Sequence, residues 1–177
     1  VLSSEIVYEF EIPSEIYFNH FTHEDVQMQK SILQPCFLEK GRSNPERKFE
    51  DFLESNSDIA WWWKNGVSTR EYFGIRYEYP KDTIHTFYPD YLVKHVDGTI
   101  GIYEVKSATD PDGIDTSTAK AEALYKYVKV NSNKKRPLVG GFVIPKARDI
   151  LLHNQEVYDW AKTENGDWSD WKSFPRK

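Results

Sequence analysis

The stretch "FYPDYLVKHVDGTIGIYEVKS", from Phe87 to Ser107, decides the fold. It contains two runs with the alternating pattern of β-strands, and Asp97-Gly98 between them is a strong hairpin signal. In the second run both faces are apolar up to Tyr103, as expected for a strand at the centre of a sheet. The stretch therefore predicts a central β-hairpin.

Three charged residues, Asp90, Glu104 and Lys106, interrupt this apolar hairpin. Because side chains alternate between the two faces of a strand, Glu104 and Lys106 continue the face that begins with Ile100 and Ile102. The antiparallel pairing brings Asp90 close to Glu104, and two carboxylates that near repel each other unless a cation lies between them. A bound metal ion is one interpretation; a solvated strand end neutralised by Lys106 is the other.

One helix is predicted before the hairpin and one after it. "NPERKFEDFLESN" (44–56) indicates a helix with Asn44 as its cap and Pro45 in the first turn. Its apolar stripe consists of Phe49, Phe52 and Leu53. "AKAEALYKYVKV" (119–130) indicates the second helix, capped by Thr116 or Ser117.

Further strands are predicted at "DIAWWW" (58–63), "REYFGIRYEYP" (70–80) and "LVGGFVIP" (138–145), the last as a final buried strand. "IVYEFEIPSEIYF" (6–18) reads as one or two short strands. Because a helix separates the hairpin from the final strand, that strand joins the sheet in parallel. The fold class is α/β, a central mixed sheet flanked by helices, with an α-β-β-β-α-β core.

Length and composition predict a single domain over 1–177, which includes a C-terminal extension at 148–177. In the aromatic C-terminal extension, Trp160, Trp168 and Trp171 are expected to pin the tail to the core. The chain does not start with Met, which suggests a piece of a longer protein. Cys36 is the only cysteine, so an internal disulfide is excluded, and a reducing, cytoplasmic location is expected.

The formal net charge of -5 argues against a general phosphate-binding surface, which is usually basic. Any contact with nucleic acid must then come from a local patch, a metal-neutralised site or a partner domain. No apolar run approaches the roughly 20 residues that a membrane-spanning helix needs.

Pro89-Asp90 and Glu104-Val105-Lys106 together resemble the motif of the PD-(D/E)XK nuclease superfamily. More widely, "WWWKNG", "FYPDYLVKHVDGTIGIYEVKS" and "AKAEALYKYV" resemble the C-terminal nuclease region of type III restriction subunits and related DEAD/DEAH helicases. The resemblance covers about residues 45–145, which would form the core of the domain, with extensions at 1–44 and 148–177. It implies a restriction-endonuclease-like sandwich and a Mg²⁺-dependent endodeoxyribonuclease that hydrolyses DNA phosphodiester bonds.

The resemblance also implies a set of site residues. Asp90 and Glu104 would bind Mg²⁺, for which Mn²⁺ can substitute, and the Val105 carbonyl would be a third ligand. Oxygen ligands of this kind suit a hard cation. Lys106 would orient the attacking water and offset the charge that builds up on the phosphate.

Several further residues have weaker claims. Many members of this superfamily add an acid from the first helix, and Glu46 is preferred to Glu50 for this catalytic role, as a ligand of a second metal ion or as a support for the other ligands, because it lies nearer the apolar stripe by helical spacing. The alternative for Glu46 is a favourable interaction with the helix dipole. Lys120 matches a family lysine that could contact phosphate, or it is a solvated helix lysine. The tryptophans at 61–63 could stack on nucleobases, although burial of Trp61 and Trp63 together is favoured.

The implied partners are double-stranded DNA, a helicase or translocase domain in the parent chain, and a DNA-methyltransferase subunit. Two alternatives stay open. One is a catalytically silent DNA-binding or assembly module with the same fold. The other is a nuclease of the same superfamily that acts in repair, transposition or Holliday-junction resolution, because a fold does not fix a function.

Overall fold

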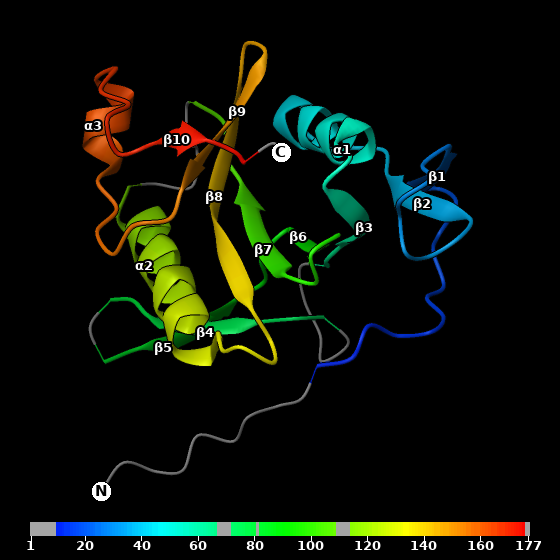
Figure 1. Cartoon of the computed structure of the whole chain (residues 1–177), viewed down its shortest axis with the longest axis horizontal. Coiled ribbons are helices and arrows are strands. Elements are labelled where there is room, and N and C mark those ends of the chain that lie inside the picture. Colours follow the sequence, from blue (N-terminus) through cyan, green and yellow to red (C-terminus); the bar gives the residue numbers. More distant parts are fainter. Residues whose placement is uncertain (1–9, 67–71, 81, 109–113, 176–177) are drawn as a thin grey trace, which may run out of the picture.

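The computed structural model describes residues 10–66, 72–80, 82–108 and 114–175 (Figure 1). Along the chain, the elements are β1 (His23–Val26), β2 (Cys36–Glu39), α1 (Asn44–Ser55), β3 (Ile59–Lys64), β4 (Ile75–Glu78), β5 (Ile84–Phe87), β6 (Tyr91–His95), β7 (Ile100–Val105), α2 (Ile114–Asn131), β8 (Leu138–Lys146), β9 (Asp149–His153), α3 (Trp160–Glu164) and β10 (Lys172–Ser173). Within these described ranges, no helix is both long and apolar enough to cross a membrane.

The central sheet has six strands in the order β10-β9-β8-β7-β6-β3. Strands β7 and β8 are parallel and the other neighbours are antiparallel, so the predicted α/β class with a mixed sheet is confirmed. The predicted order of elements is present as α1-β3-β6-β7-α2-β8. The prediction that β8 is the final strand is wrong, because β9 and β10 of the tail extend the sheet beyond it.

Both faces of the sheet are covered, with α1 on one side and α2 on the other (Figure 1). Each face has its own apolar core. The core under α1 includes Phe49, Leu53, Val93 and Tyr103, and the core under α2 includes Leu92, Ile102, Leu124 and Phe142. Strands β6 and β7 therefore lie between two apolar layers, as their sequence predicts.

Two hairpins lie outside the central sheet. Strands β1 and β2 pair with each other, as do β4 and β5. The strand predicted at 70–80 is thus shorter and belongs to a separate hairpin inserted between β3 and β6; its residues 70–71 lie outside the described ranges. The strand predicted at 6–18 is wrong for residues 10–18, which form no strand. Residues 6–9 of that prediction lie outside the described part of the chain.

Both predicted helix caps are displaced. Helix α1 is capped by Ser43 rather than Asn44, and the Ser43 hydroxyl accepts a hydrogen bond from the Glu46 backbone while the Glu46 side chain accepts one from the Ser43 backbone. This reciprocal capping box satisfies two otherwise unpaired donors. Helix α2 begins at Ile114, so Thr116 and Ser117 lie inside it, and the cap predicted there is wrong.

The tryptophans mainly fill the core. Trp62 and Trp63 are buried in opposite cores because both faces of β3 are covered, whereas Trp61 is half-buried. The expectation that Trp61 and Trp63 are buried together is therefore wrong. In the tail, Trp160 and Trp171 are buried against the α2-side core, so their predicted role in pinning the tail is confirmed.

Candidate active site

Asp90 and Glu104 meet at one end of the central sheet. Tyr91 lies opposite Tyr103 in the β6–β7 pair, so the same register places the preceding Asp90 beside Glu104. The Asp90 Oδ2 atom accepts a hydrogen bond of 2.8 Å from the Val105 backbone N–H. The carboxylate of Asp90 is thereby held against β7, next to Glu104.

Glu104 has a buried carboxylate with one oxygen unpaired. Its Oε1 atom lies 3.3 Å from Lys106 Nζ, and only 10% of its side chain is exposed. Among the described residues, its buried Oε2 atom has no hydrogen-bond partner. Lys106 is buried as well, with its ammonium group 5.6 Å from the centre of the Phe142 ring. A buried carboxylate oxygen without a partner is unfavourable unless a cation or proton joins it.

The electrostatics of Glu104 reflect this position. Burial, followed by the nearby Asp90 carboxylate, raises the pKa of Glu104 to about 8, although the ammonium groups of Lys106 and Lys120 lower it. Lys120 on α2 therefore lies near enough to act on the site, while Lys126 and Lys129 on later turns are exposed. Two acids this close stay ionised together only when a cation lies between them.

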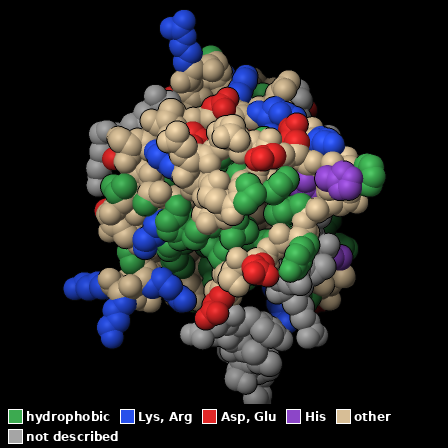
Figure 2. Space-filling model, turned by 90° about the vertical axis from the view of Figure 1, so that its right-hand side faces the viewer, with side chains coloured by type: hydrophobic (Ala, Val, Ile, Leu, Met, Phe, Trp, Pro, Cys, Tyr) green, Lys and Arg blue, Asp and Glu red, His purple; other side chains and the backbone are tan. Residues whose placement is uncertain are grey.

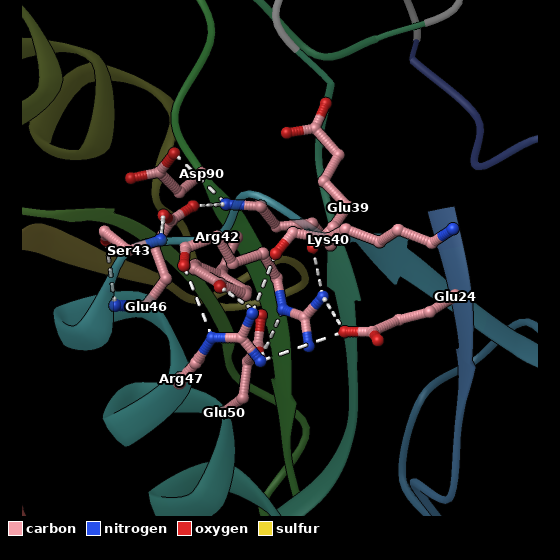
Figure 3. Close-up of polar contacts among 11 residues, drawn as sticks. Glu24, Glu39, Lys40, Arg42, Ser43, Glu46, Arg47, Glu50 and Asp90 are labelled. Carbon is pink, nitrogen blue, oxygen red and sulfur yellow. Dashed lines mark hydrogen bonds and ion pairs between the residues drawn. The ribbon is translucent and has the colours of Figure 1, made fainter. Parts of the chain in front are cut away.

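Lys64, at the end of β3, connects Asp90 to the first helix. Its ammonium group forms an ion pair with Glu46 and lies 3.4 Å from Asp90 Oδ1. Figure 3 shows the Glu46 and Asp90 carboxylates meeting at this one nitrogen. Glu46 thus takes part in both the helix cap and an ion pair beside Asp90, so its two interpretations are not exclusive. Burial is the largest single effect on the pKa of Glu46 and raises it. The attraction of Lys64 and the hydrogen bonds to Lys64 and Ser43 together outweigh burial, so the pKa of Glu46 is lowered.

Glu50 lies away from Asp90, in a buried network. Its carboxylate accepts a hydrogen bond of 2.8 Å from the Tyr91 hydroxyl and one of 3.1 Å from Arg42 Nε. Glu50 is 1% exposed whereas Glu46 is half-buried, so spacing from the apolar stripe, which favoured Glu46, does not identify the buried acid of α1. The physical reason is that Arg42, which follows the β1–β2 hairpin, covers the side of α1 that carries Glu50 (Figure 3).

Asn65 holds the backbone that presents Asp90. Its backbone N–H donates to the Asp90 carbonyl at 2.7 Å. Its buried side chain donates to the carbonyls of Pro89 and Phe73, both at 2.8 Å, and accepts from the Phe73 N–H at 3.0 Å. Asn65-Gly66 is a turn signal in the sequence, which is a sufficient reason for an asparagine there, and no sequence pattern singles out Lys64 or Arg42. The one available signal was the "WWWKNG" stretch, which contains Lys64 and Asn65.

The substitution Asn65→Ala is expected to destabilise the protein by about 2–4 kcal/mol, because it leaves buried donors and acceptors unpaired. The matched control is Asn133→Ala, since the exposed Asn133 side chain accepts from two backbone N–H groups in a surface turn. The control should lose less than about 1 kcal/mol, because water can replace its hydrogen bonds. Urea denaturation of both variants measures the difference, and equal losses would contradict a clamping role for Asn65.

The residues present fit a divalent cation. Two carboxylates and a backbone carbonyl are the kind of oxygen ligands that Mg²⁺ and Mn²⁺ take, with water and substrate as further ligands. The unpaired Glu104 Oε2 atom is the observation on which this fit rests. In the described residues, no group of three or more His, Cys, Asp or Glu side chains could hold a metal ion. A metal ion at this site would therefore need ligands other than side chains, such as the backbone carbonyl and water.

Comparisons of the chain with protein-family models, with curated proteins and with solved structures give no match. The functional assignment therefore depends on the geometry of the site.

Proposed function

We propose that the chain is a metal-dependent endonuclease domain with a restriction-endonuclease-like fold that hydrolyses DNA phosphodiester bonds. The observation that carries the proposal is the unpaired, buried carboxylate oxygen of Glu104, beside Asp90 and in contact with Lys106. The order of elements and the mixed sheet support it, since both agree with the α-β-β-β-α-β core expected from the sequence.

In this proposal, Asp90, Glu104 and the Val105 carbonyl would hold the Mg²⁺ or Mn²⁺ ion. A bound ion of this type polarises the scissile phosphate and lowers the pKa of a bound water. Lys106 would orient the attacking water, because its buried ammonium is already fixed beside Glu104 at 3.3 Å. The same positive charge would stabilise the negative charge that develops on the phosphate in the transition state.

The proposed substrate is double-stranded DNA, contacted near the site by Lys120. On the face shown in Figure 2, which carries the N-terminal hairpin, Lys and Arg side chains are interspersed with Asp and Glu around a hydrophobic middle. Because the net charge is also negative, a partner must supply part of the contacts with DNA. A helicase or translocase domain of a longer cytoplasmic chain would supply these DNA contacts, together with a DNA-methyltransferase subunit, as in type III restriction.

A second candidate is a catalytically silent module with the same fold. The observation in its favour is that both oxygens of Asp90 already have partners, Lys64 and the Val105 N–H. Against it stands the buried Glu104 Oε2 atom, which has no hydrogen-bond partner among the described residues and which a bound cation would satisfy.

Incubation of the protein with supercoiled plasmid tests the proposal. Nicking is expected with Mg²⁺ or Mn²⁺ and not with EDTA, and Lys106→Met is expected to reduce the rate by about 10²–10³-fold, as for loss of one group that stabilises transition-state charge. The matched control is Lys126→Met, which removes an exposed lysine of α2 and should leave the rate unchanged. Equal nicking by all three proteins would indicate a contaminant and remove the support for an enzyme.

A further inference from the structure

A single ammonium group, that of Lys64, lies between two of the three acids around the proposed site. It forms ion pairs with Glu46 and with Asp90 Oδ1, while the third acid, Glu104, pairs with Lys106 instead. We propose that Lys64 is a positioning residue that takes the place of a second cation, so that the site binds one divalent metal ion, between Asp90 and Glu104. This inference rests on the proposed function and adds to it the number of metal ions.

The packing holds Lys64 in this position. It is the last residue of β3 and lies opposite Tyr91 in the β3–β6 pair. Tyr91 directly follows Asp90 in the chain. Its ammonium group lies 4.4 Å from the centre of the Tyr91 ring, a favourable cation–π contact. The Tyr91 ring is in turn fixed, because its hydroxyl donates to the buried Glu50. The side chain of Lys64 is 19% exposed, so most of its surface is packed against other residues.

The hydrogen bonds of Glu46, Asp90 and Glu104 define two places where a positive charge would be favourable. Between Glu46 and Asp90, the location is filled by the Lys64 ammonium group. The other Glu46 oxygen accepts from the Ser43 backbone, so this acid has no oxygen without a partner. Between Asp90 and Glu104, by contrast, the buried Oε2 atom of Glu104 has no partner among the described residues. Among these three acids, only Glu104 therefore has an oxygen without a partner in the described part of the chain.

Titration with Mn²⁺ tests the inference, using calorimetry for stoichiometry and electron paramagnetic resonance to detect two neighbouring ions. The wild type is expected to bind one ion. Lys64→Met, which keeps the length of the side chain but removes the charge, is expected to bind two, because Glu46 and Asp90 then face each other without a cation. Lys64→Arg should restore binding of one ion, as should the double variant Lys64→Met/Glu46→Gln.

The outcomes separate this inference from the proposed function. If the wild type and Lys64→Met both bind one ion with equal affinity, the role of Lys64 is overturned and the nuclease proposal stands. Two ions in the wild type also overturn it, and this measurement needs no variant to fold. If neither protein binds Mn²⁺, the proposed function fails and the inference fails with it. Circular dichroism of each variant confirms that the sheet is intact before the titration is interpreted.

Discussion

Replacing Glu104 by Gln is expected to abolish metal-dependent cleavage and, at the same time, to stabilise the metal-free protein at alkaline pH. The loss of activity should be about 10³-fold or more, because a metal ion contributes several kcal/mol to the transition state and each 1.36 kcal/mol is a factor of ten. The gain in stability follows because the variant no longer carries a buried carboxylate with an unpaired oxygen.

The pH dependence gives this prediction a definite sign. Burial and the neighbouring Asp90 raise the pKa of Glu104 from 4.5 to about 8. Between these two values the native protein binds a proton that the unfolded chain has released, so the free energy of unfolding falls as the pH rises. The Gln side chain has no such proton. In EDTA, the melting temperature of the wild type should therefore fall more steeply than that of Glu104→Gln between about pH 5 and about pH 8.

Addition of Mg²⁺ near pH 8 completes the test. The wild type should become more stable, because a ligand that binds only the native state shifts the folding equilibrium, and Glu104→Gln should not respond. Glu122→Gln is the matched control, since it neutralises an exposed acid on α2 and should retain both the pH slope and the response to Mg²⁺. Parallel pH slopes for wild type and Glu104→Gln, or an undiminished Mg²⁺ response in the variant, would contradict a metal role for Glu104.

Local sequence patterns predicted the centre of the molecule well. The Asp97-Gly98 turn and the alternation on each side of it define β6 and β7, and the register of this hairpin alone brings Asp90 to Glu104. The apolar stripe of α1 likewise follows from helical periodicity, since Phe49, Phe52 and Leu53 are all buried. These features depend on residues close together in the chain, where a period of two or 3.6 is informative.

Features that depend on distant residues escaped prediction. The ion pairs of Lys64 join it to Glu46 and Asp90, 18 and 26 residues away, and no periodicity links such positions. Helical spacing placed Glu46 nearer the apolar stripe than Glu50 because it considers α1 alone. Once Arg42 covers the other side of that helix, Glu50 becomes the buried acid. The β1–β2 hairpin, which leads to Arg42, lacks a clear alternating pattern, so it could not be predicted from the sequence.

The β1–β2 hairpin lies in the stretch 1–44, which was expected to be an extension outside the core. Cys36 and Leu38 of β2 belong to the apolar core that also contains Phe49 and Tyr91, and the guanidinium group of Arg42 contacts Glu24, the Glu39 carbonyl and Glu50. Residues 23–42 are thus joined to α1 both by apolar packing and by a buried ion pair. Stability should therefore depend on this segment as strongly as on the predicted core, and a substitution at Arg42 measures that dependence.

Arg42→Met is expected to reduce the free energy of unfolding by about 3–5 kcal/mol, the usual cost of removing one partner from a buried ion pair. The loss is large because Arg42 and Glu50 expose only 3% and 1% of their side chains, so water cannot solvate the remaining carboxylate. The double variant Arg42→Met/Glu50→Met should recover at least half of that loss, since apolar side chains of similar volume replace a buried pair at little cost. Urea denaturation of the three proteins gives the values.

Arg47→Met is the matched control, because Arg47 also faces Glu24 but is 43% exposed. It should lose only about 1 kcal/mol, as expected for an exposed ion pair and its surface hydrogen bonds. If Arg42→Met costs no more than this control, the segment 23–42 is only loosely attached to α1. If instead the double variant is as unstable as Arg42→Met, the cost arises from lost packing around the guanidinium group, because an unpaired Glu50 charge is then absent.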